Sequence, residues 1–168
     1  MSATEQEQIS SWLQGRLPDD WFTEPAEVSV DRDEIVIVGR IAVPDGDASD
    51  ADEAAAGRIS RFREDTREQR MKIAREAERR FERKVSWGAT CGETRALFTH
   101  VAAPVMTRLR QPERQVLDTL VEAGVARSRA DALGWCVRLV GEHAEEWLDQ
   151  LRDAMTSVQR LRSEGPGL

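Results

Sequence analysis

Residues 104–140 change their hydrophobic period, and this change restricts what the chain can fold into. Val105, Thr107 and Leu109 alternate with Met106, Arg108 and Arg110, which predicts a β-strand. After Gln111, apolar residues recur at the spacing of an α-helix instead. We therefore predict a strand at 105–109, followed by a helix that ends near residue 123 and a second helix whose apolar face continues to Arg162, with a kink or break near Gly141.

The two predicted helices have recognisable ends. Pro112 lies in the first turn of the first helix, where its missing N–H costs nothing, and Gly124 suits the position just after the last turn. Ser128 predicts the N-cap of the second helix. The apolar face of the first helix consists of Val116, Leu117, Leu120 and Val121. That of the second consists of Ala132, Leu133, Cys136, Leu139 and Val140.

This order of elements resembles the ribbon-helix-helix family of Arc- and MetJ-type DNA-binding proteins. The resemblance covers residues 104–140 and rests on the strand, on Leu120–Gly124 and on Arg127–Leu133, which opens the second helix. In that family two chains pair their strands into an antiparallel ribbon that enters the major groove. The resemblance implies a homodimer that binds double-stranded DNA. It does not extend to the N-terminal half.

Carried over position by position, the resemblance implies two groups of DNA-contacting residues. Met106 and Arg108 would face the bases, with Pro104 or Arg110 at the margins, and arginine can bind guanine through two hydrogen bonds. The N-terminus of the second helix would hold a phosphate on its free N–H groups. The residues at this phosphate site would be Arg127, Ser128 and Arg129.

Residues 1–43 predict a small unit made of a helix and a β-hairpin. Thr4 and Glu7 have the spacing of a capping box, and Ile9, Trp12 and Leu13 share one face of the helix that follows. Two β-branched runs, 28–30 and 35–38, flank a polar four-residue turn.

The remainder predicts an acidic linker followed by a mostly helical domain. Residues 44–53 contain no large apolar side chain, which is typical of a solvated linker. We assign 54–162 to one domain that begins with a long basic helix to residue 84, and 163–168 to a flexible tail. Two glycines between residues 85 and 92 indicate that the basic helix ends there. A break in the later helix is expected near Gly141. The predicted fold class is α+β, mostly helical.

Charge is distributed unevenly along the chain, whose net charge is −7. Residues 1–57 carry 14 acidic and 3 basic side chains, whereas residues 58–84 carry 11 basic and 6 acidic ones. The basic helix is therefore a second nucleic-acid or partner surface, or simply a solvated charged face. Its candidate residues are Arg61, Arg63, Arg67, Arg70, Lys72, Arg75 and Arg79.

Catalytic and metal-binding patterns are missing from the sequence. There are two histidines and two cysteines, Cys91 and Cys136, without the spacing of a zinc site, and we expect Cys91 in a loop. Phosphate-binding and nucleophile motifs are also missing. We therefore expect no enzyme activity, no cofactor and no metal. No apolar run approaches the roughly 18 residues of a membrane span, and we expect a cytoplasmic protein.

Taken together, the sequence favours a dimeric DNA-binding protein, either a transcriptional regulator or a nucleoid-associated factor, that inserts a β-ribbon into the major groove. One alternative is a protein-interaction adaptor that uses the ribbon-helix-helix-like element only to dimerise. It would bind its partner through the basic helix or the N-terminal unit, with Trp12, Trp21 and Phe22 as anchors. Another alternative is an RNA- or ribosome-binding factor that uses residues 58–84.

Overall fold

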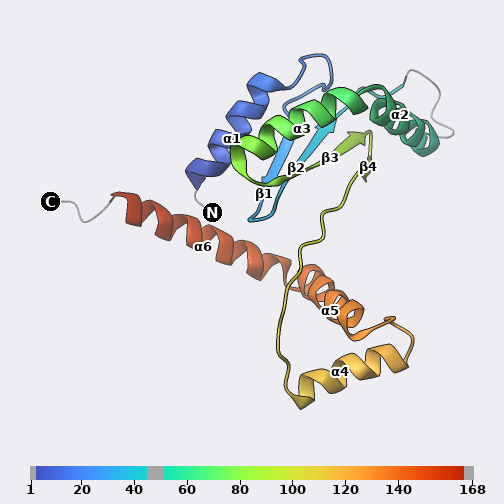
Figure 1. Ribbon diagram of the computed structural model, residues 1–168, viewed down its shortest axis with the longest axis vertical. Helices are drawn as coiled ribbons and strands as arrows, with labels where there is room; N and C mark the ends of the chain where they lie inside the picture. Colours follow the sequence, from blue (N-terminus) through green and yellow to red (C-terminus); the bar gives the residue numbers. More distant parts are fainter. Residues whose placement is uncertain (1–2, 45–50, 165–168) are drawn as a thin grey trace. The chain divides into compact units, whose positions relative to one another are not determined.

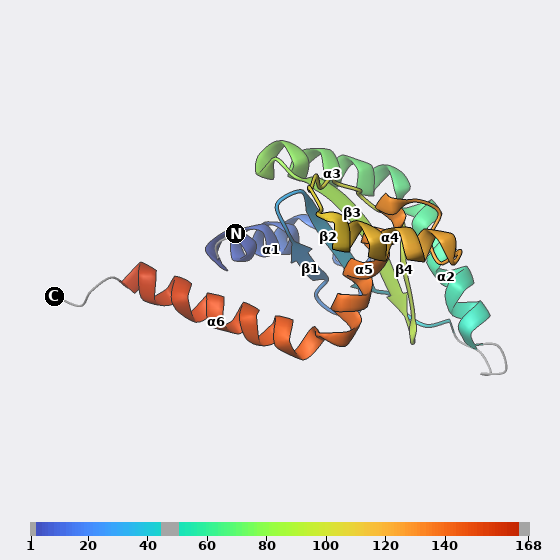
Figure 2. The ribbon, with the colours of Figure 1, turned by 90° about the horizontal axis from the view of Figure 1, so that it is seen from below.

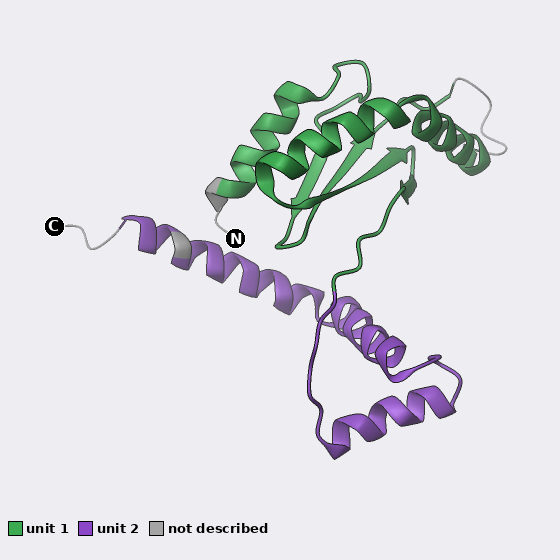
Figure 3. Ribbon diagram, in the orientation of Figure 1, with its two compact units in different colours: residues 1–103 green, residues 104–168 purple. Residues whose placement is uncertain are grey.

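A computed structural model describes residues 3–44 and 51–164 and divides the chain into two compact units, 1–103 and 104–168 (Figure 3). Unit 1 contains α1 (Ala3–Arg16), β1 (Glu27–Val30), β2 (Glu34–Arg40), α2 (Ala51–Asp65), α3 (Arg67–Phe81), β3 (Lys84–Cys91) and β4 (Thr94–Leu97). Unit 2 contains α4 (Gln111–Glu122), α5 (Arg129–His143) and α6 (Glu145–Glu164). Helices and a sheet in one chain confirm the predicted α+β class.

Unit 1 is built on a four-stranded sheet in the order β1-β2-β3-β4 (Figure 1). β1 and β2 pair antiparallel, and Asp31 Oδ1 closes their turn by accepting hydrogen bonds from the N–H groups of Asp33 and Glu34, at 2.8 and 2.7 Å. β2 and β3 pair in parallel, which requires the crossover through α2 and α3. β3 and β4 form a second antiparallel pair around Gly92, whose φ is +58°.

The helices of unit 1 cover one face of this sheet, and the core lies between (Figure 2). Ile9 and Leu13 of α1 are fully buried there, which agrees with the predicted apolar face of this helix. The ring of Trp21 lies edge-on to those of Phe62 and Trp87, with centroids 5.7 and 6.0 Å apart. The other buried members are Val30, Ile35, Ile37, Ile41, Ala55, Ile59, Ile73, Ala89, Cys91 and Phe98.

The structure groups the chain differently from the predicted division into 1–43, 44–53 and 54–162. The predicted hairpin is not a unit of its own, because β2 pairs with β3 along seven residues. Of the stretch 85–92, predicted as a break, residues 85–91 lie in β3, one of the two central strands, and Cys91 is fully buried there instead of lying in a loop. The apolar residues of this stretch are interleaved with two glycines and a serine, which conceals their alternation.

The predicted long helix is two helices that meet at Thr66. The Thr66 hydroxyl donates to the Phe62 carbonyl at 2.6 Å and accepts from Arg70 Nε at 2.9 Å, so the side chains at the joint bond to each other and to the backbone. α2 also includes residues 51–53, which we had assigned to the linker. Residues 45–50 of that linker, 165–168 of the predicted tail and the Thr4 side chain lie outside the described residues.

Unit 2 is a series of three helices with a small interior. The two predicted helices are present as α4 and α5. The break in the helix expected near Gly141 lies three residues later, at Ala144, between α5 and α6. The strand predicted at 105–109 is not formed in the single chain: residues 101–110 belong to no helix or strand and pair with no strand of residues 3–44 or 51–164, and the ribbon shows them as an extended connection (Figure 1). In the ranges that the structure describes, no helix is long and apolar enough to cross a membrane.

The close approach of β3 and β4 gives a test of unit 1. A Cβ added to Gly88 would lie 2.8 Å from the Ala96 carbonyl oxygen and 2.7 Å from Leu97 Cδ2. We expect Gly88→Ala to destabilise the protein by about 1–3 kcal/mol in chemical denaturation, because backbone must move.

Gly57→Ala is the matched control, since Gly57 lies within α2 and a Cβ there meets nothing within 4 Å. It should be neutral or stabilise by up to about 1 kcal/mol. Equal stability of the two variants would contradict the described pairing of β3 with β4.

Candidate nucleic-acid interface

The segment that precedes α4 presents most of its side chains to solvent. Met106 is 98% exposed, and Arg108 and Arg110 are also exposed. Leu109 is half-buried against the small core of unit 2, and its carbonyl accepts a hydrogen bond from Arg114 Nη1 at 2.7 Å. The end of the segment is therefore anchored to α4, while the three residues predicted to contact DNA project away from the core.

The N-terminus of α5 is capped as predicted. Ser128 has extended backbone angles, and its hydroxyl accepts a hydrogen bond from the Asp131 N–H at 3.2 Å. Asp131 Oδ2 in turn accepts from the Arg127 N–H at 3.0 Å, and this bond lowers the pKa of the Asp131 carboxyl. A carboxylate thus occupies the positive end of the helix dipole that the resemblance assigns to a phosphate.

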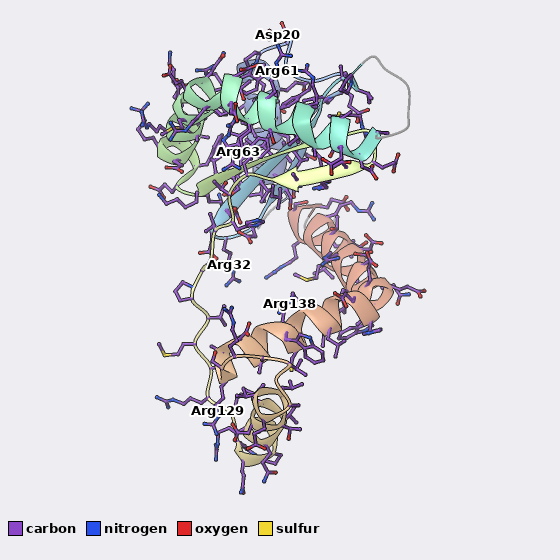
Figure 4. All side chains as sticks on the ribbon, turned by 90° about the vertical axis from the view of Figure 1, so that its right-hand side faces the viewer. Asp20, Arg32, Arg61, Arg63, Arg129 and Arg138 are labelled. Carbon is purple, nitrogen blue, oxygen red and sulfur yellow. The ribbon has the colours of Figure 1, made fainter. Side chains whose placement is uncertain are left out.

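Arg129 has a different role from the predicted one. The Arg129 side chain is labelled in Figure 4. Its Nε and Nη2 donate to the two carboxylate oxygens of Asp118, both at 2.6 Å, which joins α5 to α4. The same bonds lower the pKa of Asp118 and raise that of Arg129. Arg129 therefore holds the two helices together. Arg127 Nε lies 3.6 Å from Asp131 Oδ2, but with its side chain 95% exposed Arg127 is the more accessible cation at this end of α5. Asp118 was missed because no spacing rule links residues on opposite sides of a turn.

The predicted basic surface of residues 58–84 is divided by the joint at Thr66. Arg70 is buried instead of exposed: it bonds to Thr66 and to the Arg63 carbonyl, and its guanidinium lies 4.8 Å from the centroid of the Phe98 ring. Burial, together with the neighbouring Arg63 and Arg67, lowers the pKa of Arg70 to about 10. Arg63 lies 5.7 Å from the centroid of the same ring.

The remaining cations of that surface lie among acids. Arg61 Nε lies 3.6 Å from Asp65 Oδ2, and both residues belong to α2. Arg75 and Arg79 line an open cavity of about 630 Å³, together with three further basic and three acidic residues. These are Arg32, Arg83, Lys84, Asp33, Glu78 and Glu82. Arg67 and Lys72 are exposed on α3. Such mixed charge gives a polyanion a weaker hold than a continuous row of arginines would.

The aromatic residues proposed as anchors for a protein partner belong to the packing of unit 1. Trp21 is 9% exposed, Trp12 packs edge-on against Phe81, and Phe22 lies close above Gly39. In the described part of the chain, no group of three or more histidine, cysteine or acidic residues could hold a metal ion.

The apolar surface of unit 2 is the other notable feature of this region. Its buried hydrophobic residues are Leu117, Ala126 and Ala132, whereas large apolar side chains on all three helices remain exposed. These exposed side chains are Val116, Val137, Val140, Trp147, Leu151, Met155, Val158 and Leu161. So large an exposed apolar surface is typical of a helical unit that completes its core with a partner.

The chain is thus a two-unit α+β protein in which an extended segment with two arginines, 104–110, precedes the α4–α5 hairpin in the sequence. It belongs to the Rv1265-like family. Residues 7–97 match the family model described as the N-terminal domain of Rv1265-like protein, and residues 110–162 match the Mb1296 C-terminal domain. These two matches fall inside units 1 and 2, respectively, and support the boundary at residue 103.

The relatives are mycobacterial proteins. The chain is 58% identical over 159 residues to the uncharacterized proteins Mb1296 of Mycobacterium bovis and Rv1265 of Mycobacterium tuberculosis. The matched region covers 95% of this chain and 70% of each relative. No solved structure matches the chain.

The ion pair between α4 and α5 predicts acid sensitivity. The pKa values of Asp118 and Asp131 are lower in the folded chain than the ordinary value of 3.8. Their contribution to stability is therefore complete above that value and is lost as the pH falls through the folded pKa. We expect amide exchange in α4 and α5, corrected for intrinsic rates, to accelerate as the pH falls below about 4.

Asp118→Asn should accelerate this exchange at pH 7 and weaken its dependence on acid, because Arg129 loses its partner. Glu122→Gln, which removes an exposed carboxylate from the same helix, is the control. Unchanged exchange in Asp118→Asn at pH 7 would show that the ion pair does not hold the two helices.

Proposed function

We propose that this protein is a dimeric DNA-binding protein, a transcriptional regulator or nucleoid-associated factor that inserts a β-ribbon into the major groove. The observation that carries the proposal is the exposed, unpaired segment 104–110 in front of the α4–α5 hairpin. An extended segment without a partner strand can pair with its own copy about a two-fold axis. Such a two-stranded ribbon fits the major groove of B-DNA.

A homodimer would also bury the apolar side chains that unit 2 exposes in the single chain. Val116 is 54% exposed on α4 although its neighbour Leu117 is buried, so the apolar face of this helix extends past the core of the single chain. Pairing two copies would cover this face and bring two 104–110 segments together. The same pairing would double the number of arginines at the DNA surface.

The contacts with DNA would come from the ribbon and from one end of α5. Arg108 would bind base edges, while Arg110 and Arg127 would approach phosphates. Ser128 would act by holding the helix terminus in place, since its hydroxyl already caps α5. In this proposal the protein is not an enzyme, carries no cofactor and works in the cytoplasm.

The first test is DNA binding by fluorescence anisotropy, using short duplexes from pooled genomic fragments at about 50 and 200 mM salt. The full chain should bind, and its affinity should fall steeply with salt, because phosphate contacts release counterions. Arg108→Ala with Arg110→Ala should weaken binding at least about 10-fold, since each arginine–guanine contact is worth about 1–3 kcal/mol.

Arg75→Ala with Arg79→Ala is the matched control, because it removes the same charge from α3. It should leave binding unchanged. If this control loses binding and the Arg108 variant keeps it, the nucleic-acid surface lies on α3. A folded dimer that shows no salt-dependent binding would overturn the proposal in favour of an adaptor.

A further inference from the structure

The C-terminal helix α6 carries an apolar face that the single chain leaves exposed. Trp147, Val158 and Leu161 are 59%, 53% and 63% exposed, and Leu151 and Met155 lie on the same face. α6 has 20 residues, which corresponds to about 30 Å. An amphipathic helix draws most of its stability from packing of its apolar face, so a partner for this face is expected.

The apolar residues of α6 repeat every seven positions. If the positions of the repeat are lettered a to g, Leu151 and Val158 occupy position a, and Trp147, Ala154 and Leu161 occupy position d. This is the pattern of helices that pack side by side along their whole length. Ala144, the residue just before α6, has the spacing of a further a position. The Ala144 N–H donates to the Val140 carbonyl, and the Ala144 carbonyl accepts from the Leu148 N–H, both at 2.9 Å. These two bonds link Ala144 to α5 and to the first turn of α6, while its backbone angles, φ −121° and ψ 21°, mark the break between the two helices.

We propose that α6 packs antiparallel against α6 of a second copy of this chain. In an antiparallel pair each a position faces a d position of the other helix. Ala144 then faces the partner's Leu161, Trp147 faces the partner's Val158, and Leu151 faces the partner's Ala154. The layers closest to the two-fold axis and those farthest from it each combine a large residue with a small one, as even packing requires.

The parallel arrangement fits the same residues badly. Identical positions would face each other, so that Trp147 would meet its own copy and Ala154 would meet another alanine. The layer of two tryptophans would lie two layers away from the layer of two alanines at 154, so the same two helices would need to be far apart at one layer and close together at the other. The parallel pair would leave voids around the small side chains, and protein interiors contain few voids, so the parallel pair is disfavoured.

Charge favours the antiparallel arrangement as well. The first half of α6 is acidic, with four carboxylates and Arg152, whereas the second half carries two arginines and one carboxylate. The carboxylates of the first half are those of Glu145, Glu146, Asp149 and Asp153. An antiparallel pair places each acidic half beside the more basic half of the other helix, and a parallel pair would place the acidic halves together.

This pairing does not depend on DNA binding, since it concerns residues outside segment 104–110. It is tested by cysteine cross-linking of the full chain in a Cys136→Ser background, where the remaining Cys91 is fully buried. Ala144→Cys and Leu161→Cys chains, one carrying a mass tag, are mixed while reduced and then oxidised. The expected product is the mixed disulfide dimer.

Each variant alone should give little cross-linked dimer, because two copies of residue 144 lie about 26 Å apart in the antiparallel pair. Efficient cross-linking of Ala144→Cys with itself would overturn the antiparallel arrangement. Lack of cross-linking in the mixture would overturn the pairing of α6 altogether.

A charge introduced at the seam provides a second readout. Leu151→Glu should reduce the mixed disulfide at least about 10-fold, because it buries a carboxylate between the helices. Thr156→Glu, which adds the same charge on the exposed opposite face, should leave the cross-link unchanged. Equal yields from both would count against the proposal. Anisotropy on the same samples separates the two proposals, since DNA binding without the cross-link overturns the α6 pair alone.

Discussion

The helices of unit 2 bury too little apolar surface to account for their own order. Within the described part of this unit, the buried hydrophobic residues are Leu117, Ala126 and Ala132, two of them alanines. Burial of a large apolar side chain contributes about 1.5–3 kcal/mol, so a core of this size cannot offset the entropy of ordering three helices. In the proposed dimer a second copy would supply the missing contacts by covering the apolar faces of α4 and α6. The Asp118–Arg129 pair joins α4 to α5 within each chain.

Unit 1, in contrast, buries a large apolar core within one chain. The parallel pairing of β2 with β3 places four strands under three helices, and the core that results includes Ile35, Ile37 and Trp87. The joint between α2 and α3 is fixed by Arg70, whose guanidinium is held by Thr66, by a carbonyl and by the Phe98 ring instead of by a carboxylate. Because the buried guanidinium of Arg70 needs these partners, it favours the one angle between α2 and α3 that brings them together. Phe98 follows β4 directly, so the chain that leaves the sheet is anchored where it departs.

The sequence was sufficient for elements whose signals are local. Pro112 and Gly124 marked the two ends of α4, and Ser128 marked the start of α5, because capping involves residues within one turn. The strands of the β1–β2 hairpin were also predictable, since a polar turn separates two β-branched runs. The parallel partner of β2 lies about fifty residues away, and Gly88 and Ser86 conceal the alternation of β3, so the sheet and the domain boundary were missed. The ionic partner of Arg129 and the burial of Arg70 depend on tertiary packing, which no spacing of residues reports.

The charge of the chain decides what kind of DNA binding is possible. A net charge of −7, concentrated in the first 57 residues, repels phosphates over a Debye length of about 10 Å at 0.1 M salt. Under the proposed function, DNA binding would depend on a local group of cations placed close to the groove, where short-range contacts exceed the general repulsion. In the proposed dimer, Arg108, Arg110 and Arg127 of two copies would form such a group. Dimerisation would then be a condition for DNA binding and not merely a way to stabilise unit 2, because a single chain presents too few cations to overcome its own charge.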